Sequence, residues 1–171
     1  MKNNISLLLS RFFFSTSIIL LIFPQLLFSK SIEGKVVKVS DGDTLTVLSD
    51  QTEYKIRLNG IDAPEKAQNF GRIAKNALSR LVFKKRVEVQ LQGRDKYRRY
   101  LGTVYFNGKE INLEMIKLGF AWHYKKYSND ENYARAEEIA KSKSIGLWSQ
   151  ESPVPPWEYR RNKPTIHSKK A

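Results

Sequence analysis

The sequence predicts an α+β domain in which five short strands form a barrel and three helices pack outside it. Three β-branched segments open the domain, and each alternates apolar with polar residues at the strand period of two. Apolar residues then recur at helical spacing once between strands and twice after them. Three strands, a helix, two strands and two helices fit a closed five-stranded Greek-key barrel of the OB type.

The expected strands alternate apolar and polar residues between turn signals. Leu45 and Val47 share one face of the second strand, and Arg57 lies on the polar face of the third. The five segments are residues 32–39, 43–49, 53–59, 86–92 and 100–106.

The helices are expected over residues 69–83, 110–119 and about 129–143. Asn69 is available as the N-cap of the first helix, since a short polar side chain can accept from the free N–H groups there. Gly119 is placed to end the second helix, where a left-handed residue commonly follows the last turn.

Both ends of the chain differ in composition from this domain. Lys2 and Arg11 precede an apolar run that ends near Ser29 and Ser31, which is the pattern of a secretory signal peptide. We therefore expect residues 1–31 to direct export, to the periplasm or the medium. The alternative is an uncleaved membrane anchor, although the run is short for a span and contains a proline.

The remaining boundaries follow from the same shift in composition. Residues 32–149 are expected to form the folded domain, and residues 150–171 a basic, proline-rich tail with little core of its own. No internal repeat is visible, and a monomer is the simplest expectation.

A formal net charge of +13 favours a polyanionic partner. Anionic membrane surfaces and acidic polysaccharides remain compatible with that charge. The chain has no cysteine, so it contains neither a thiolate nucleophile nor a thiolate metal site.

Three carboxylates follow the ends of neighbouring expected strands: Asp43, Asp62 and Glu65. Each motif alone is compatible with an ordinary turn. If they converge, two carboxylates about 5 Å apart repel by about 3 kcal/mol at an effective dielectric near 20, so a cation must compensate. Oxygen ligands without nearby His123 or His167 favour calcium or magnesium over zinc.

Basic residues accompany the carboxylates. Arg57 lies five residues before Asp62, and a second cluster contains Lys96, Arg98 and Arg99. Such clusters are often only solvated surface. Arginine, however, can hold two phosphate oxygens at once, which suits attack on a phosphodiester beside a metal.

Aromatic and basic residues alternate in the segment 119–127. Tyr124 and Lys125 are candidate nucleic-acid contacts, because base stacking on an aromatic ring tolerates any base. Trp122 could stack in the same way, or it could belong to the core.

Five motifs occur together in one order: "DGDT" at 41–44, "IRLNGIDAPE" at 56–65, "DKYRRYLG" at 95–102, "GFAWHYKKY" at 119–127 and "SIGLW" at 144–148. With them, the sequence resembles the staphylococcal nuclease family over about residues 32–149. The resemblance implies an OB barrel and a calcium-dependent endonuclease that cleaves DNA and RNA to products with 3′-phosphates. It also implies that Asp43, Asp62 and the backbone carbonyl of Ala63 bind the calcium ion.

The same resemblance assigns the other roles. Arg57 and Arg99 would hold the scissile phosphate, and Glu65 would act as the general base or orient the attacking water. Trp122 and Tyr124 occupy positions that border the nucleotide pocket in the family.

Two positions depart from the family pattern. Arg98 stands where a glycine is common, and a positive φ there would cost an arginine about 1–2 kcal/mol. It also offers an extra phosphate contact. Ile73 stands in the first helix where an acidic residue is frequent.

The sequence therefore predicts an exported, calcium-dependent, sugar-nonspecific endonuclease that acts on DNA and RNA, with a preference for single-stranded or frayed substrate. The alternative is a non-catalytic OB module that binds single strands, since this fold does not by itself imply chemistry. Binding alone would not need Asp43, Asp62 and Glu65 beside Arg57 and Arg99.

Overall fold

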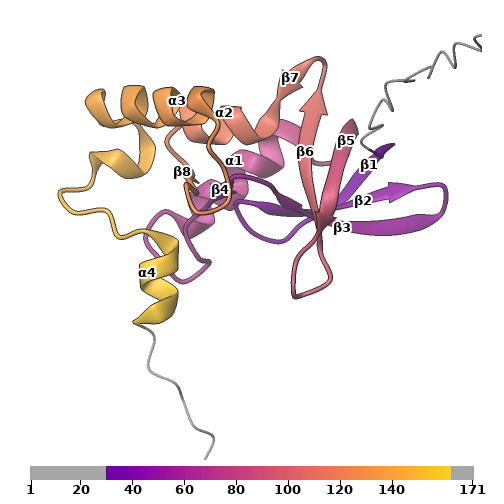
Figure 1. Ribbon diagram of the computed structural model, residues 1–171, viewed down its shortest axis with the longest axis horizontal. Coiled ribbons are helices and arrows are strands. Elements are labelled where there is room, and N and C mark those ends of the chain that lie inside the picture. Colours follow the sequence, from indigo (N-terminus) through magenta and orange to yellow (C-terminus); the bar gives the residue numbers. More distant parts are fainter. Residues whose placement is uncertain (1–29, 163–171) are drawn as a thin grey trace, which may run out of the picture.

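A computed structural model describes residues 30–162 of the chain (Figure 1). Most of the expected signal segment and the end of the tail, residues 163–171, lie outside the described part. Ser31, the last residue assigned to the leader, is the first residue of the first strand. No helix within residues 30–162 is long and apolar enough to cross a bilayer.

Five strands form a closed barrel, as the sequence predicted. The sheet runs in the order β3-β2-β1-β5-β6, and β3 closes the ring by pairing in parallel with β6. A two-residue strand, β7, pairs antiparallel with the last residues of β6. The strands are β1 (Ser31–Val39), β2 (Thr44–Ser49), β3 (Thr52–Leu58), β5 (Arg86–Arg94), β6 (Tyr100–Phe106) and β7 (Lys109–Glu110).

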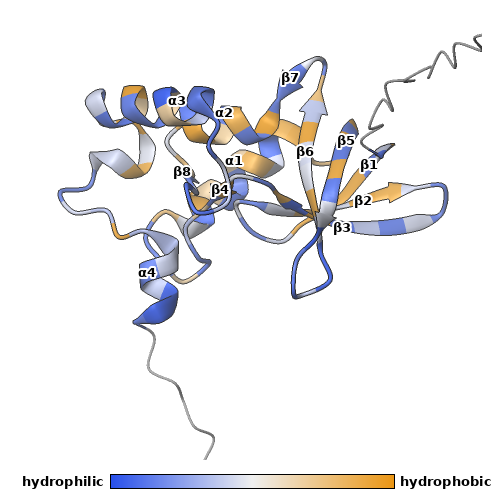
Figure 2. Cartoon of the chain, in the orientation of Figure 1, coloured by the Kyte–Doolittle hydropathy of each residue, from blue (hydrophilic) through white to orange (hydrophobic). Residues whose placement is uncertain are grey.

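Three helices accompany this barrel: α1 (Gly71–Val82), α2 (Ile111–Lys117) and α3 (Glu131–Ser142). The first two contact barrel strands, whereas α3 packs on α2 and β8. Figure 1 shows α2 and α3 side by side at one end of the barrel. The core consists of the inward faces of the strands and the apolar stripes of the helices, with Leu45, Ile56 and Leu78 fully buried. In Figure 2 the apolar residues of these strands and helices are orange.

The start of α1 differs from the sequence prediction. Asn69 does not cap this helix. Phe70 is the N-cap residue, with φ of 64°, and no side chain bonds to the first turn. The chain turns sharply at this cap. Gly71 lies against the backbone of Glu65, and a Cβ on Gly71 would stand 2.0 Å from the Glu65 carbonyl oxygen.

Asn112 of α2 connects this helix to the closing point of the barrel. Its amide nitrogen donates to the carbonyl oxygens of Asn59 (3.0 Å) and Gly102 (3.1 Å), and its amide oxygen accepts from the N–H of Val104 (3.1 Å). The side chain is fully buried. One amide therefore satisfies three backbone groups where β3 meets β6.

A second, very small sheet was not predicted. It pairs β4 (Ile61–Asp62) with β8 (Trp122–His123), so Asp62 stands opposite Trp122. Two residues per strand are too few to show a sequence period. This sheet attaches the proline turn after Asp62 to the segment that follows α2.

The described part of the tail is ordered. A 3₁₀ turn, η1 (Gly146–Ser149), leads to a fourth helix, α4 (Pro156–Arg161), which begins with proline at its first position. Gln68 donates to the Val154 carbonyl oxygen (2.5 Å), and Pro156 is buried. The tail was expected to have little core, but α4 packs against the loop that carries Glu65.

Replacing Asn112 with Ala should lower the free energy of unfolding by about 2–3 kcal/mol, because buried backbone groups would lose their partners. Urea denaturation followed by circular dichroism measures the loss. Asn132→Ala, on the exposed side of α3, is the matched control and should change stability by less than about 0.5 kcal/mol. Equal stabilities of the two variants would contradict this role of Asn112.

Candidate active site

The main cleft of the described chain has a volume of about 960 Å³ and opens where β3 and β4 meet the β5–β6 loop. Figure 2 shows that this loop is hydrophilic, as is the C-terminal end of α4. Every residue expected to bind the metal or to take part in catalysis lines the cleft: Asp43, Arg57, Asp62, Ala63, Glu65 and Arg99.

Arg57 is the centre of this arrangement. Its Nη2 lies 3.2 Å from Oδ2 of Asp43 and 2.8 Å from Oδ1 of Asp62. Its Nη1 donates to the carbonyl oxygens of Leu58 (2.6 Å) and Ile61 (2.8 Å). One guanidinium therefore joins the two carboxylates and fixes the turn between β3 and β4.

Asp43 is buried and firmly oriented. Its Oδ2 accepts from the N–H of Ala63 (2.8 Å), and its Oδ1 accepts from the hydroxyl of Thr44 (3.1 Å). The neighbouring Gly42 makes this approach possible, because a Cβ there would stand 2.7 Å from the Cβ atoms of Ala63 and Ala74. The turn before β2 thus packs directly on the Ala63 segment and on α1.

Asp41 is a site residue that the sequence reading missed. It lines the same cleft, and its Oδ1 accepts from the N–H of Asp43 (3.1 Å). Burial, followed by repulsion from the Asp43 carboxylate, raises the pKa of Asp41 to about 6. The available signal was an acidic residue two positions before Asp43, within the motif "DGDT".

Asp62 is almost completely buried, and guanidinium groups bind both of its oxygens. Besides Arg57, Arg160 of α4 contacts Oδ2 (2.7 Å) and Oδ1 (3.2 Å). Burial raises the pKa of Asp62, and the bonds from Arg160 and Arg57 oppose that shift.

Glu65 also pairs with Arg160. Nη1 of Arg160 lies 2.8 Å from Oε1 of Glu65, whose side chain remains about one-third exposed. The sequence reading assigned no role to Arg160, which lies 98 residues from Asp62. The consecutive arginines after "PPWEY" were the only sequence signal.

Arg99 reaches the site from the β5–β6 loop. Asp95 holds it through Nε (2.7 Å) and Nη2 (2.7 Å), while Nη1 donates to the Thr44 hydroxyl (3.3 Å). Although burial raises the pKa of Asp95, the hydrogen bonds from Arg99 outweigh burial and lower it. Arg98 has the positive φ, 64°, that its place in the turn requires, yet Arg99 still reaches the cleft.

The residues expected to contact nucleic acid divide into two groups. Lys96 and Tyr124 line the cleft, whereas Arg98 and Lys125 are exposed outside its lining. Trp122 is only 5% exposed and packs edge-on against Trp148, with 5.1 Å between ring centroids. Its position is therefore that of a core residue, and the prediction that it stacks on a base does not fit its burial.

Other aromatic rings lie at the cleft. Tyr97 and Tyr127 are 68% and 62% exposed and both line it. Trp157 of α4 stacks on Tyr124 with parallel rings, 5.1 Å between centroids. One face of Tyr124 is thus covered by α4.

The donor atoms of this site fit a hard divalent cation. Asp43 and Asp62 share a nitrogen of Arg57, and the half-buried Asp41 adds a third carboxylate. Carboxylate oxygens are the donors that such a cation prefers. His123 is buried beside Ser128 and does not line the cleft. Within residues 30–162, however, no three acidic or imidazole side chains form a ready-made metal cage. A cation at Asp62 would have to replace a guanidinium contact.

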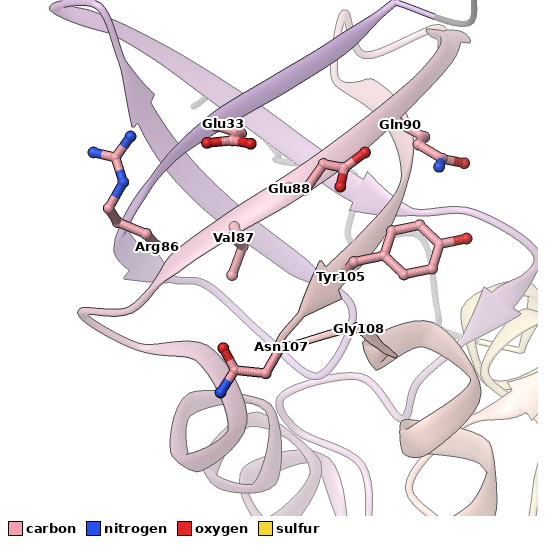
Figure 3. Close-up of a pocket in the computed structure, with 8 residues that line it drawn as sticks. All are labelled: Glu33, Arg86, Val87, Glu88, Gln90, Tyr105, Asn107 and Gly108. Atoms are coloured by element: carbon pink, nitrogen blue, oxygen red, sulfur yellow. The ribbon is translucent and has the colours of Figure 1, made fainter.

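A smaller hollow, of about 280 Å³, lies on the outer face of the barrel (Figure 3). Glu33 of β1 and Glu88 of β5 stand opposite each other there, and Tyr105 of β6 borders them. Two adjacent carboxylates do not suit a phosphate backbone. The acidic and basic residues singled out in the sequence all lie elsewhere.

Comparison with known proteins gives consistent matches. Residues 55–150 match the staphylococcal nuclease homologue family. A Haemophilus influenzae protein, named an uncharacterized endonuclease, is 50% identical over 128 residues, which are 74% of this chain and 72% of the relative. An Escherichia coli protein of the same name is 40% identical over 147 residues, 85% of this chain and 96% of the relative. The probable staphylococcal-like nuclease CAN3 of Oryza sativa subsp. japonica is 38% identical over 128 residues, 75% of this chain but 33% of that protein.

Replacing Asp41 with Asn should stabilise the protein at about pH 7.5 in buffer with chelator. The folded state raises the pKa of Asp41, so the protonated carboxyl contributes to the free energy of unfolding. This contribution is complete below the ordinary pKa of the group, and it is lost as the pH rises through about 6. The variant avoids the ionised form, which should raise the free energy of unfolding by about 1–2 kcal/mol at neutral pH and by almost nothing near pH 4.

Urea denaturation at both pH values measures this difference. Asp50→Asn, which removes a carboxylate from the exposed β2–β3 turn, is the matched control. A stability difference between D41N and wild type that is equal at both pH values would contradict the assignment.

Proposed function

The chain belongs to the staphylococcal nuclease family, and on that premise we propose that it is a calcium-dependent endonuclease that hydrolyses phosphodiester bonds in DNA and RNA. The observation that carries the proposal is the Arg57 guanidinium, which joins Asp43 to Asp62 in a cleft that Glu65 and Arg99 also line. The two bacterial relatives reported above are named endonucleases, which supports the same activity.

Arg57 and Arg99 are proposed to hold the scissile phosphate. They reach the cleft from β3 and from the β5–β6 loop, where Arg57 contacts Asp43 and Arg99 contacts Thr44. A guanidinium can bind two phosphate oxygens and stabilise the negative charge that develops on them during attack. Asp95 limits the freedom of Arg99, so less side-chain entropy is lost when the phosphate binds.

Glu65 is proposed as the general base. It is partly exposed in the cleft, and Arg160 contacts only one of its oxygens. The other oxygen can accept a proton from a water molecule as the water oxygen bonds to phosphorus. The P–O5′ bond breaks, the O5′ leaving group takes a proton from solvent, and the phosphate remains on the 3′ side.

Asp43, Asp62 and the carbonyl of Ala63 are proposed to hold the calcium ion. These are hard oxygen donors, and both carboxylates are buried beside the cleft. A bound calcium ion would supply positive charge near the phosphate oxygens.

Single-stranded or frayed nucleic acid is the proposed form of the substrate. The exposed rings of Tyr97 and Tyr127 at the cleft can stack on unpaired bases, and the basic net charge favours phosphate contacts. We also propose export through the N-terminal apolar segment and action as a monomer. A non-catalytic binding module is the second candidate, and it leaves the buried carboxylates unexplained.

The purified protein should degrade denatured DNA and RNA in the presence of calcium, and EGTA should stop the reaction. Release of acid-soluble nucleotides measures the activity, and added excess calcium should restore it. Activity that persists in EGTA would contradict the cation assignment, while absence of hydrolysis with intact binding would favour the binding module.

Replacing Glu65 with Gln should lower kcat by about 10²–10⁴-fold, because the amide cannot accept the proton. KM should change little, since Gln can still accept a hydrogen bond from Arg160. Glu138→Gln, on the exposed side of α3, is the control and should retain wild-type kinetics. An unchanged kcat in E65Q would remove Glu65 from catalysis.

A further inference from the structure

The helix α4 places a third arginine in the proposed active site. Arg160 lines the cleft with Arg57 and contacts two carboxylates at once, Asp62 and Glu65. It is the only residue of α4 that does so within the described chain. Arg161, next to it, is exposed and does not line the cleft.

Three contacts fix the position of Arg160. Trp157 stacks on Tyr124 and stands edge-on to Trp122, with 6.4 Å between the ring centroids. Gln68 bonds the segment just before α4. The helix has only six residues and could not be stable by itself, so these tertiary contacts hold the guanidinium at the cleft.

The contacts at Asp62 determine what Arg160 can do. Its Nη2 lies 2.7 Å from Oδ2 and its Nη1 3.2 Å from Oδ1, while Arg57 shares Oδ1. Asp62 is 1% exposed. Each oxygen of this nearly buried carboxylate therefore already accepts a bond from Arg160, so a cation that approaches Asp62 meets the guanidinium first.

We propose that Arg160 is a positioning residue of the active site that competes with the divalent cation for Asp62 and thereby sets the affinity of the site for that cation. The inference rests on the cation site of the proposed function. When Arg160 is bound, its charge balances Asp62 and Glu65. When a cation binds Asp62, Arg160 leaves Oδ2 and α4 loses one of its contacts.

The proposed competition predicts the direction in which the cation affinity changes when Arg160 is removed. A cation must displace a charge-assisted hydrogen bond, so removal of the guanidinium should strengthen cation binding. A residue that only supports the fold would have the opposite effect, because its loss would weaken the site. Reciprocity also requires that the cation weaken the docking of α4.

Isothermal titration of calcium into the full chain, without nucleic acid, tests the proposal. In Arg160→Ala the Kd should fall by about three- to tenfold relative to wild type, a range suited to a partly exposed ion pair. Arg160→Lys should give an intermediate value, since lysine keeps the charge but not the two-pronged geometry. Arg161→Ala removes the same charge from the next residue and should shift the Kd by less than about twofold.

Hydrogen exchange of the α4 amides gives a second measurement. Calcium should accelerate their exchange in wild type and have no such effect in R160A. Circular dichroism confirms that each variant is folded. Equal or weaker calcium binding in R160A than in wild type would overturn the inference and leave the proposed function intact. If neither protein binds calcium, the cation assignment itself fails, and the inference fails with it.

Discussion

The ion pairs of Arg57 with Asp43 and Asp62 are the constraint on which the rest of the site depends. Two buried carboxylates cannot remain ionised side by side without a positive partner, because burial and mutual repulsion both disfavour the charges. Arg57 supplies that partner and also bonds the carbonyl oxygens of Leu58 and Ile61. The electrostatic requirement and the path of the backbone are therefore met by one side chain.

The fold supplies the other conditions for this cluster. The parallel pairing of β3 with β6 brings the Arg57 strand beside the strand that follows Arg99. Close packing at Gly42 brings the Asp43 turn onto the Ala63 segment. The helix α4 then adds Arg160 from the far end of the sequence. Each of the charged groups thus comes from a different segment of the chain, and the cluster forms only when the fold brings these segments together.

Much of this arrangement could be predicted from the sequence, and the parts that could not have physical reasons. Alternation and helical spacing indicated the barrel and its three main helices, because long elements carry a period. The β4–β8 pairing is too short for one. It buries Trp122, which the alternation of aromatic and basic residues left open as either a stacking surface or a core residue. Arg160 was missed because α4 depends on tertiary contacts, whereas its proline-rich, basic sequence is typical of an unstructured tail.

A crystal structure with calcium and a nucleotide phosphate bound would test the central claim most directly. The account predicts a calcium ion in contact with Asp43 and Asp62, a phosphate against Arg57 and Arg99, and Arg160 withdrawn from Oδ2 of Asp62. A calcium ion bound away from these two carboxylates, or one that leaves every Arg160 contact to Asp62 in place, would contradict it.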